Sequence, residues 1–299
     1  MLSYIHAFHA GNAADVLKHA TISLALEILK QKEKPLCVID THAGSGIYSL
    51  FDERATKTAE AEDGIIKLLF SIGRFPKEIL PFLSADFVQK NEKPIFNESL
   101  EPYLKIVLDF LKNAKYPGSP AIESTFLDEN DDLILNELHP KVFEELRENA
   151  KSFAKKPQIH RRDSWEFALA ITPPKIKRGI MIIDPSYEDD SDWEKCAQTV
   201  QAVQKKWNAG IFAIWYPVLA HRVKELSILK EKIAAIAPGK TLDVQIITKD
   251  FDFSQNSSAL CGSGMIFAPA PWKLDEKISV ALPQIAKSLN AKEFSLKTL

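Results

Sequence analysis

The sequence predicts an α/β fold in which a mostly parallel, doubly wound sheet is covered by helices on both faces. Short apolar runs rich in β-branched residues alternate with longer stretches of helical spacing, as expected for strands joined by crossover helices. The last two apolar runs are joined by a short segment without helical spacing, which predicts an antiparallel hairpin closing one edge of the sheet. We expect seven strands: one beginning at residue 35, one ending just before Asp163, and five over residues 133–138, 179–184, 211–216, 242–248 and 264–267.

The first helix is predicted over residues 13–31, where Val16, Leu17, Ala20 and Leu24 belong to a broad apolar stripe. Pro35 ends this pattern, and the run PLCVID then leads as a strand into a glycine turn. Helical spacing returns between the later strands and predicts helices over residues 141–151, 193–206, 220–237 and 274–289.

The interval between the first and second strands is far longer than one helix needs. After the glycine turn at residues 44–46, no further strand is expected until about residue 133. Residues 65–69, 79–87 and 104–111 have helical character. We therefore predict that residues 51–115 form an inserted helical subdomain, and that residues 1–50 and 116–299 form the main domain.

Composition and charge indicate a soluble protein of the cytoplasm. The hydrophobic content of 45% over 299 residues provides for a sizeable core. The formal net charge of −2 does not by itself indicate a nucleic-acid partner. No segment approaches the roughly 18 apolar residues that span a bilayer, and the first residues lack the pattern of a signal peptide. The three cysteines form no C-x-x-C pair, which favours a reducing compartment.

Local charge is more informative than the total. One basic stretch runs from Lys151 to Arg162, and a second, Lys175 to Arg178, directly precedes the strand at residues 179–184. Beside an active-site edge, such stretches could hold phosphates. A solvated lysine-rich face explains them equally well.

The segment DTHAGSG, residues 40–46, is predicted to be a strand-to-helix turn whose glycines let the backbone approach a ligand closely. Asp40 at the strand end suits a sulfonium and an amino-acid group better than a pyrophosphate, because a carboxylate repels phosphate. The spacing after Gly44 also departs from G-x-G-x-x-G, which argues against an NAD-dependent oxidoreductase. An aspartate that simply caps the next helix is the competing interpretation of Asp40.

Two further acids follow predicted strands. Glu137 ends the run LILNEL, where a carboxylate can accept both hydroxyls of a ribose, although an acid at a helix N-terminus ahead of Pro140 is the alternative. Asp163 and Ser164 follow IHRR, and Asp163 is placed to accept the adenine amine of a cofactor. The segment YPGSP, residues 116–120, predicts a turn that closes the insertion.

The strand at residues 179–184 ends in Asp184, Pro185, Ser186 and Tyr187. Ligands of open α/β sheets bind at the carboxyl ends of such strands. An acid and backbone carbonyls can accept the hydrogens of an exocyclic amine while an aromatic ring stacks on the base. We therefore expect Asp184, Pro185 and Tyr187 to form a catalytic turn.

The histidines do not predict a metal site. His6, His9, His19 and His42 match no standard zinc spacing, and no cysteine is paired with them. Contacts with a cofactor or a base, or structural roles in the core, are the alternatives.

The segments together resemble the RlmJ-type 23S rRNA adenine-N6 methyltransferases, over nearly the whole chain. The resemblance rests on LSYIHAFHAGNAADVLKH, DTHAGSGIY, YPGSP, ELHP, RRDSWE, DPSYE, IWYPV and SGMIFAPAPWKL, in that order. It implies a Rossmann-like, seven-stranded S-adenosylmethionine-dependent methyltransferase fold with a small helical insertion, and 23S rRNA as the partner, either naked or in an assembling large subunit. No oligomer is required.

The same resemblance implies roles for individual residues. It assigns Asp184 as the catalytic acid and Tyr4, His6 and Lys18 to substrate engagement. The cofactor contacts that it implies are His19, His42, Ser119, Glu137, Asp163 and Ser164.

One departure from the family pattern concerns the catalytic turn, where Ser186 replaces the second proline of Asp-Pro-Pro-Tyr. The backbone carbonyls remain, but the fixed φ angle of proline is lost, so we expect lower rigidity rather than lost chemistry. Three alternatives remain open: a DNA adenine methyltransferase, a protein glutamine methyltransferase, and a weakened homologue that only binds RNA.

Overall fold

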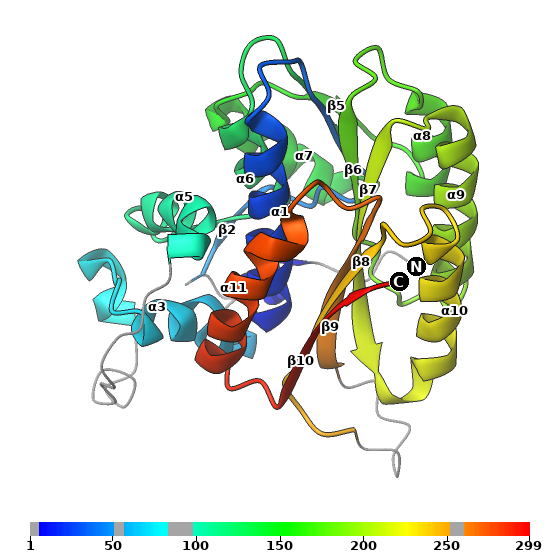
Figure 1. Ribbon diagram of the computed structural model, residues 1–299. Helices are drawn as coiled ribbons and strands as arrows, with labels where there is room; N and C mark the ends of the chain where they lie inside the picture. Colours follow the sequence, from blue (N-terminus) through cyan, green and yellow to red (C-terminus); the bar gives the residue numbers. More distant parts are fainter. Residues whose placement is uncertain (1–5, 51–56, 83–97, 252–259) are drawn as a thin grey trace.

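A sheet of eight strands runs through the molecule, with helices on both of its faces (Figure 1). The computed structural model describes residues 6–50, 57–82, 98–251 and 260–299. The strands of this sheet are β1 (Cys37–Asp40), β4 (Asp132–Asn136), β5 (Gln158–His160), β6 (Gly179–Ile183), β7 (Gly210–Leu219), β8 (Leu242–Ile247), β9 (Leu260–Ala268) and β10 (Glu293–Thr298).

The strand order is β5-β4-β1-β6-β7-β9-β8-β10, and all pairs from β5 to β7 are parallel. The predicted α/β fold with a mostly parallel sheet is confirmed. The predicted hairpin is confirmed as β8 and β9, which are antiparallel. However, β10 rather than this hairpin forms the edge, as an eighth strand that the sequence did not predict. Its segment EFSLKT is mostly exposed and lacks an apolar run, so it gives little strand signal.

The helices divide between the two faces of the sheet (Figure 1). Each of the five helices predicted in the main domain corresponds to an observed one. One face carries α1 (Ala13–Lys30), α6 (Ser119–Phe126), α7 (Pro140–Asn149) and α11 (Leu274–Ser288), and the other carries α8 (Ser164–Ile171), α9 (Asp192–Lys206) and α10 (Val223–Ala234).

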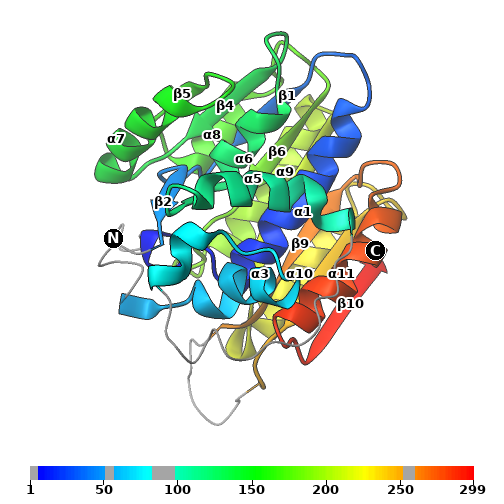
Figure 2. The same cartoon turned by 90° about the vertical axis from the view of Figure 1, so that its left-hand side faces the viewer.

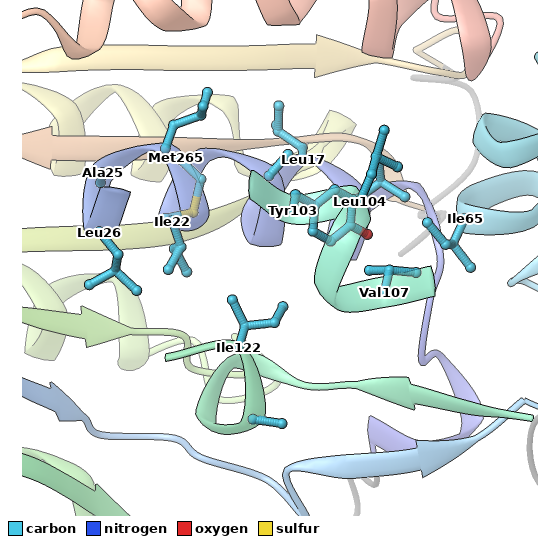
Figure 3. Close-up of a cluster of buried hydrophobic side chains, with 14 of the residues drawn as sticks. Leu17, Ile22, Ala25, Leu26, Ile65, Tyr103, Leu104, Val107, Ile122 and Met265 are labelled. Atoms are coloured by element: carbon cyan, nitrogen blue, oxygen red, sulfur yellow. The ribbon is translucent and has the colours of Figure 1, made fainter. Parts of the chain in front are cut away.

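Helix α1 lies at the centre of the larger core. Most of its residues are buried, including Leu17 and Ile22, as expected for a helix with apolar contacts all round. Figure 3 shows these side chains between Met265 of the sheet and the residues of α5 (Glu101–Leu111), among them Leu104. Two charged residues of α1, Asp15 and Lys18, are nevertheless buried.

The predicted insertion is entered and left through two short paired strands. β2 (Ile47–Ser49) and β3 (Lys115–Pro117) are antiparallel, with Tyr48 opposite Tyr116. The described residues between them include the π-helical turn Glu62–Ile66, α3 (Lys67–Ser71), and α5, which packs with α6 in front of α1 in Figure 2. These helices share one core with α1. The division at residues 51 and 115 remains a prediction.

Two predictions about local structure were wrong. The turn at residues 40–46 leads into β2 rather than into a helix. The segment at residues 116–120 is not only a turn, because Tyr116 and Pro117 belong to β3 and Ser119 begins α6. The helix expected after the glycine turn is therefore α6, which the chain reaches only after the insertion.

The topology places the loops after β1 and β6 side by side. From β1 the chain builds outward through β4 and β5, and then returns to β6 on the other side of β1. Ligands of doubly wound sheets bind at such a reversal of strand order, at the carboxyl ends of the strands. Within the described residues, no helix is both long and apolar enough to cross a membrane.

Candidate active site

Asp40 organises the loop after β1 from a fully buried position. Its Oδ1 accepts the backbone N–H of His42 at 2.9 Å, and its Oδ2 accepts the hydroxyl of Ser119 at 2.7 Å. Burial raises the pKa of Asp40 to about 6. Asp40 thus fixes the start of α6 against the loop, and it lies behind the cavity described below rather than in its lining.

The glycine turn at residues 44–46 is held in place by Glu137, which directly follows β4. Glu137 accepts the N–H of Gly44 at 3.0 Å and the N–H of His139 at 2.7 Å, and burial raises its pKa. Gly44 has a φ of +60°, and a Cβ there would lie 2.3 Å from the hydroxyl of Tyr48. This position therefore requires glycine on two grounds, backbone conformation and space.

A cavity of about 230 Å³ lies between this loop, α1 and the end of β6. It is bounded by residues from segments that are far apart in the sequence. Its lining includes every predicted cofactor contact except Asp40, namely His19, His42, Gly44, Ser119, Glu137, Asp163 and Ser164.

Two of the histidines that line this cavity, His19 and His42, are neutral near pH 7. Burial lowers the pKa of His19 to about 3 and that of His42 to about 4. His19 Nδ1 contacts the hydroxyl of Tyr116 at 2.9 Å. Its buried Nε2 lies 3.8 Å from Asp15 Oδ1 and has no hydrogen-bond partner among the described residues. No group of residues in the described part of the chain is arranged to hold a metal ion.

Asp163 forms the N-cap of α8. Its Oδ1 accepts the backbone N–H groups of Trp165 and Glu166, both at 3.0 Å, so the loop after β5 is fixed at the cavity. Trp165 in turn packs edge-on against His42, with ring centroids 5.5 Å apart.

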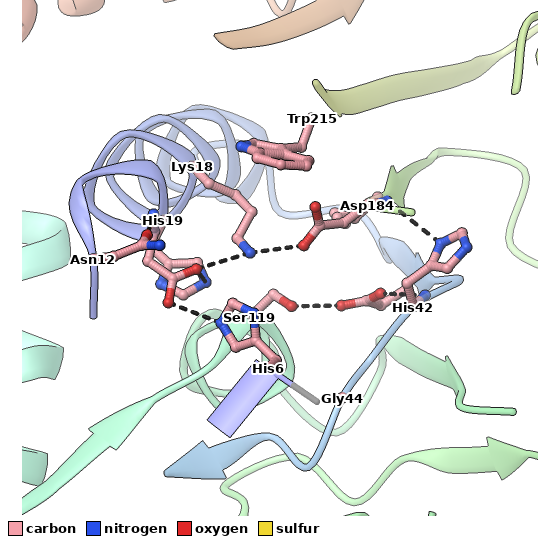
Figure 4. A network of polar contacts seen from close by, with 12 residues as sticks. His6, Asn12, Lys18, His19, His42, Gly44, Ser119, Asp184 and Trp215 are labelled. Carbon is pink, nitrogen blue, oxygen red and sulfur yellow. Dashed lines mark hydrogen bonds and ion pairs between the residues drawn. The ribbon is translucent and has the colours of Figure 1, made fainter. Parts of the chain in front are cut away.

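The acid of the catalytic turn belongs to a buried charge network (Figure 4). Asp184 Oδ2 accepts a hydrogen bond from Lys18 Nζ at 2.7 Å, and Lys18 Nζ lies 2.9 Å from Asp15 Oδ1. Asp15 Oδ2 contacts His6 Nε2 at 2.9 Å and accepts the N–H of Gly11. Burial opposes the charge on Lys18, but the two carboxylates outweigh it and raise the pKa of Lys18 well above its usual value.

Lys18 is only 4% exposed, and its ammonium group is paired with the carboxylates of Asp15 and Asp184. It is therefore not free to hold phosphate. Asp15 was not predicted, although its spacing three residues before Lys18 on one helix would have indicated a pair. Burial also opposes the charge on Asp15, but His6 and Lys18 outweigh it and hold the pKa of Asp15 well below its usual value.

Tyr187 does not present its ring freely. It is 6% exposed, its hydroxyl donates to the carbonyl of Trp215 at 3.0 Å, and its ring centroid lies 4.3 Å from that of Trp193. Its φ of +54° is unusual for a bulky residue and turns the chain sharply after Ser186. Ser186 itself is exposed and accepts the N–H of Glu188 at 3.4 Å.

A groove of about 1010 Å³ meets the first cavity at the catalytic turn. The two hollows share His6, Lys18, Asp184, Pro185 and Ser186, and the groove continues past Tyr187 and Trp215. Asp184 therefore stands where a molecule in the small cavity and a molecule in the groove would meet.

Some sequence predictions fall elsewhere. Tyr4 lies outside the described residues. The stretch from Lys175 to Arg178 precedes β6 and so lies at the opposite end of that strand from Asp184, which contradicts its predicted place beside the active site. Arg178 instead donates to the backbone carbonyls of Lys34 and Leu29. Asp15, Tyr48 and Trp165 complete the site but were not predicted as part of it.

Comparisons with known proteins agree over most of the chain. The family model described as "Ribosomal RNA large subunit methyltransferase D, RlmJ" matches residues 33–297. Two proteins named "Ribosomal RNA large subunit methyltransferase J" are similar, one from Escherichia coli at 33% identity and one from Haemophilus influenzae at 32%, each over 97% of this chain and 94% of the relative. A crystal structure of protein LPL1258 from Legionella pneumophila matches with a TM-score of 0.79 at 25% identity, covering 97% of this chain and 98% of that one.

Proposed function

This chain belongs to the RlmJ family of ribosomal RNA large subunit methyltransferases, and we propose that it methylates the N6 amine of a specific adenine in 23S rRNA. The methyl donor is S-adenosylmethionine. The observation that carries the proposal is the position of Asp184, where the small cavity meets the larger groove.

The residues around the small cavity fit S-adenosylmethionine. Gly44, which lines this cavity, allows the positive φ of the loop and its close packing against the Tyr48 hydroxyl. The buried, unpartnered Nε2 of His19 is available to a polar group of the ligand. Glu137 and Asp163 both line the cavity, which supports their assignment as acceptors for ribose hydroxyls and an adenine amine, and the acidic lining favours a sulfonium over a phosphate.

S-adenosylmethionine supplies an electrophilic methyl group and leaves as a neutral thioether. The task of the protein is therefore to position the amine in line with that methyl group and to exclude water. Asp184 and the carbonyl of Pro185 accept the two amine hydrogens, which favours a pyramidal nitrogen and frees its lone pair from the purine ring. After transfer, the surplus amine proton passes to Asp184 or to water.

Lys18 determines which role Asp184 plays. Lys18 Nζ donates to one oxygen of Asp184 at 2.7 Å, and in this proposal Asp184 acts as a hydrogen-bond acceptor for the amine before transfer and need not deprotonate it. Through Asp15 the same network reaches His6. Tyr4, His6 and Lys18 are assigned to substrate engagement in this proposal, with Lys18 acting through Asp184.

The substrate is 23S rRNA, either naked or in an assembling large subunit, and the protein works in the cytoplasm without a required oligomer. The target base is flipped out or is never paired, because the reacting amine must enter the groove. We expect Tyr187 to support the base, and its burial predicts that it does so from beneath, together with a neighbouring residue.

The test offers labelled S-adenosylmethionine to RNA, DNA and protein fractions from cells that lack this gene. Label confined to large-subunit RNA is the expected result. Label in DNA or in a glutamine side chain would replace the proposal with one of the related amine methyltransferases. Cofactor binding without label in any fraction would favour a homologue that only binds RNA.

A further inference from the structure

Trp215 lies level with Asp184 at the carboxyl edge of the sheet. In the parallel pairing of β6 with β7, Ile183 stands opposite Ile214. Asp184 follows Ile183 and Trp215 follows Ile214, so these two residues lie level with each other. The residues two positions earlier, Ile182 and Ala213, both pack into the core on the α1 side. Because side chains alternate along a strand, Asp184 and Trp215 point to that same side. Figure 4 shows the indole beside Lys18 and Asp184.

Trp215 is more accessible than the aromatic residue of the catalytic turn. Both residues line the groove, but Trp215 is partly exposed, whereas Tyr187 is almost wholly buried and packs against Trp193. The two residues are coupled, since the Tyr187 hydroxyl donates to the Trp215 carbonyl. Their ring centroids lie 6.1 Å apart at an interplanar angle of 52°, so the two rings do not form a parallel pair that would sandwich a base.

The indole N–H of Trp215 is also unusual. Nε1 is buried and has no hydrogen-bond partner among the described residues. A buried donor without an acceptor is destabilising, and such groups in native proteins commonly indicate a missing ligand or water. Trp215 therefore combines a flat aromatic surface at the groove with a donor that lacks its acceptor.

We propose that Trp215 is the residue on which the target base stacks, with Tyr187 holding it in place from beneath. This inference rests on the proposed function and concerns how the substrate is chosen. A broad indole next to the amine-accepting Asp184 favours a planar nucleobase over the small amide of a glutamine side chain, which offers far less surface to stack. The acid thus recognises the amine, and the tryptophan recognises the ring that carries it.

The first test compares Trp215→Phe and Trp215→Leu with the parent protein in methylation of 23S rRNA. Loss of one base–aromatic stack predicts that Trp215→Leu lowers kcat/KM for RNA by about 5- to 150-fold. Trp215→Phe, which keeps a ring, should recover most of that loss. The affinity for S-adenosylmethionine should stay unchanged in both variants, which a general disturbance of the site would not permit.

Trp272 provides the matched control. It is 78% exposed and follows the end of β9, where Ala268 pairs with Phe212 near the start of β7, so it lies at the opposite end of the sheet from Asp184. Trp272→Leu removes a tryptophan without touching the groove and should leave kcat/KM unchanged.

A spectroscopic test does not depend on turnover. RNA carrying 2-aminopurine at the mapped methylation position should lose fluorescence on binding the parent, because stacking on an indole quenches it, and should stay bright when bound to Trp215→Leu. Equal quenching by both proteins, or a kcat/KM for Trp215→Leu within twofold of the parent, would overturn the inference while leaving the proposed function intact. If the parent itself forms no N6-methyladenosine, the proposed function fails, and this inference fails with it.

Discussion

Lys18 Nζ lies 2.7 Å from Asp184 Oδ2 and 2.9 Å from Asp15 Oδ1, so one buried ammonium bridges the catalytic turn and the first helix. The acid that would bind the substrate amine thus accepts a hydrogen bond from a residue 166 positions away in the chain. An incoming amine must approach the free oxygen of Asp184 or share the one that Lys18 contacts.

Lys18→Met should be strongly destabilising. Removing one member of a buried ion pair leaves uncompensated charge, here on Asp15 and Asp184, and typically costs about 3–5 kcal/mol in the free energy of unfolding. Urea denaturation measures this loss. Lys112→Met, which removes a lysine from the exposed pair with Asp109, is the matched control and should change stability by less than about 1 kcal/mol. Equal effects of the two substitutions would contradict the buried network.

Gly44→Ala should weaken cofactor binding through both backbone strain and collision. Its φ is +60°, and the added Cβ would lie 2.3 Å from the Tyr48 hydroxyl. Gly239→Ala is the control, because φ there is +67° but no atom lies within 4 Å of the added Cβ. Calorimetric titration with S-adenosylmethionine should therefore show a large loss of affinity for the first variant and none for the second. Unchanged affinity in Gly44→Ala would remove the loop from the cofactor site.

Asp40→Asn should make the stability of the cofactor-free protein less dependent on pH. Burial raises the pKa of Asp40 in the folded protein to about 6, above its usual 3.8. The folded state therefore binds this proton more tightly than the unfolded state does. The resulting stabilisation is present below the unfolded pKa and is lost as pH rises through about 6.

Asparagine keeps one uncharged oxygen to accept the N–H of His42, and its NH2 group can donate to the Ser119 hydroxyl in place of the second carboxylate oxygen. The melting temperature of Asp40→Asn relative to the parent should therefore be higher at about pH 7.5 than at about pH 4.5. Thermal melts of both proteins across this range check the sign. Parallel pH curves would show that Asp40 does not titrate there.

Ser186→Pro tests the departure at the catalytic turn. Proline at a compatible position stabilises by about 0.4–1 kcal/mol by restricting the unfolded chain. The substitution removes the Ser186 hydroxyl, which accepts a weak hydrogen bond of 3.4 Å from the N–H of Glu188. We expect turnover to change little, because the carbonyl of Pro185 is kept. A large gain in turnover would mean that serine impairs the natural turn.

The main sheet was predictable because its central strands are buried on both faces and appear as continuous apolar runs. Gly179–Ile183 is the best example, with every residue buried. β10 was missed because an exposed edge strand carries little such signal. The β2–β3 pair and the late start of α6 were missed because the pairing of Tyr48 with Tyr116 spans the insertion, which no local pattern reports.

The site was predicted largely through residues that follow strands. Glu137, Asp163 and Asp184 each lie just past a parallel strand, where the fold brings acids together. The roles of Lys18 and Trp215 could not be predicted in this way. Lys18 sits within a helix, and only the packing of α1 against the sheet buries it, while Trp215 depends on the register between β6 and β7.

The most direct test of the account is the identity of the methylated nucleoside. Purified protein is incubated with labelled S-adenosylmethionine and 23S rRNA from cells lacking this gene, and the RNA is digested to nucleosides. Labelled N6-methyladenosine with the parent protein, and none with an Asp184→Ala variant that still binds cofactor, is the predicted result. Label in any other nucleoside, or N6-methyladenosine still formed by Asp184→Ala at the parent rate, would contradict it.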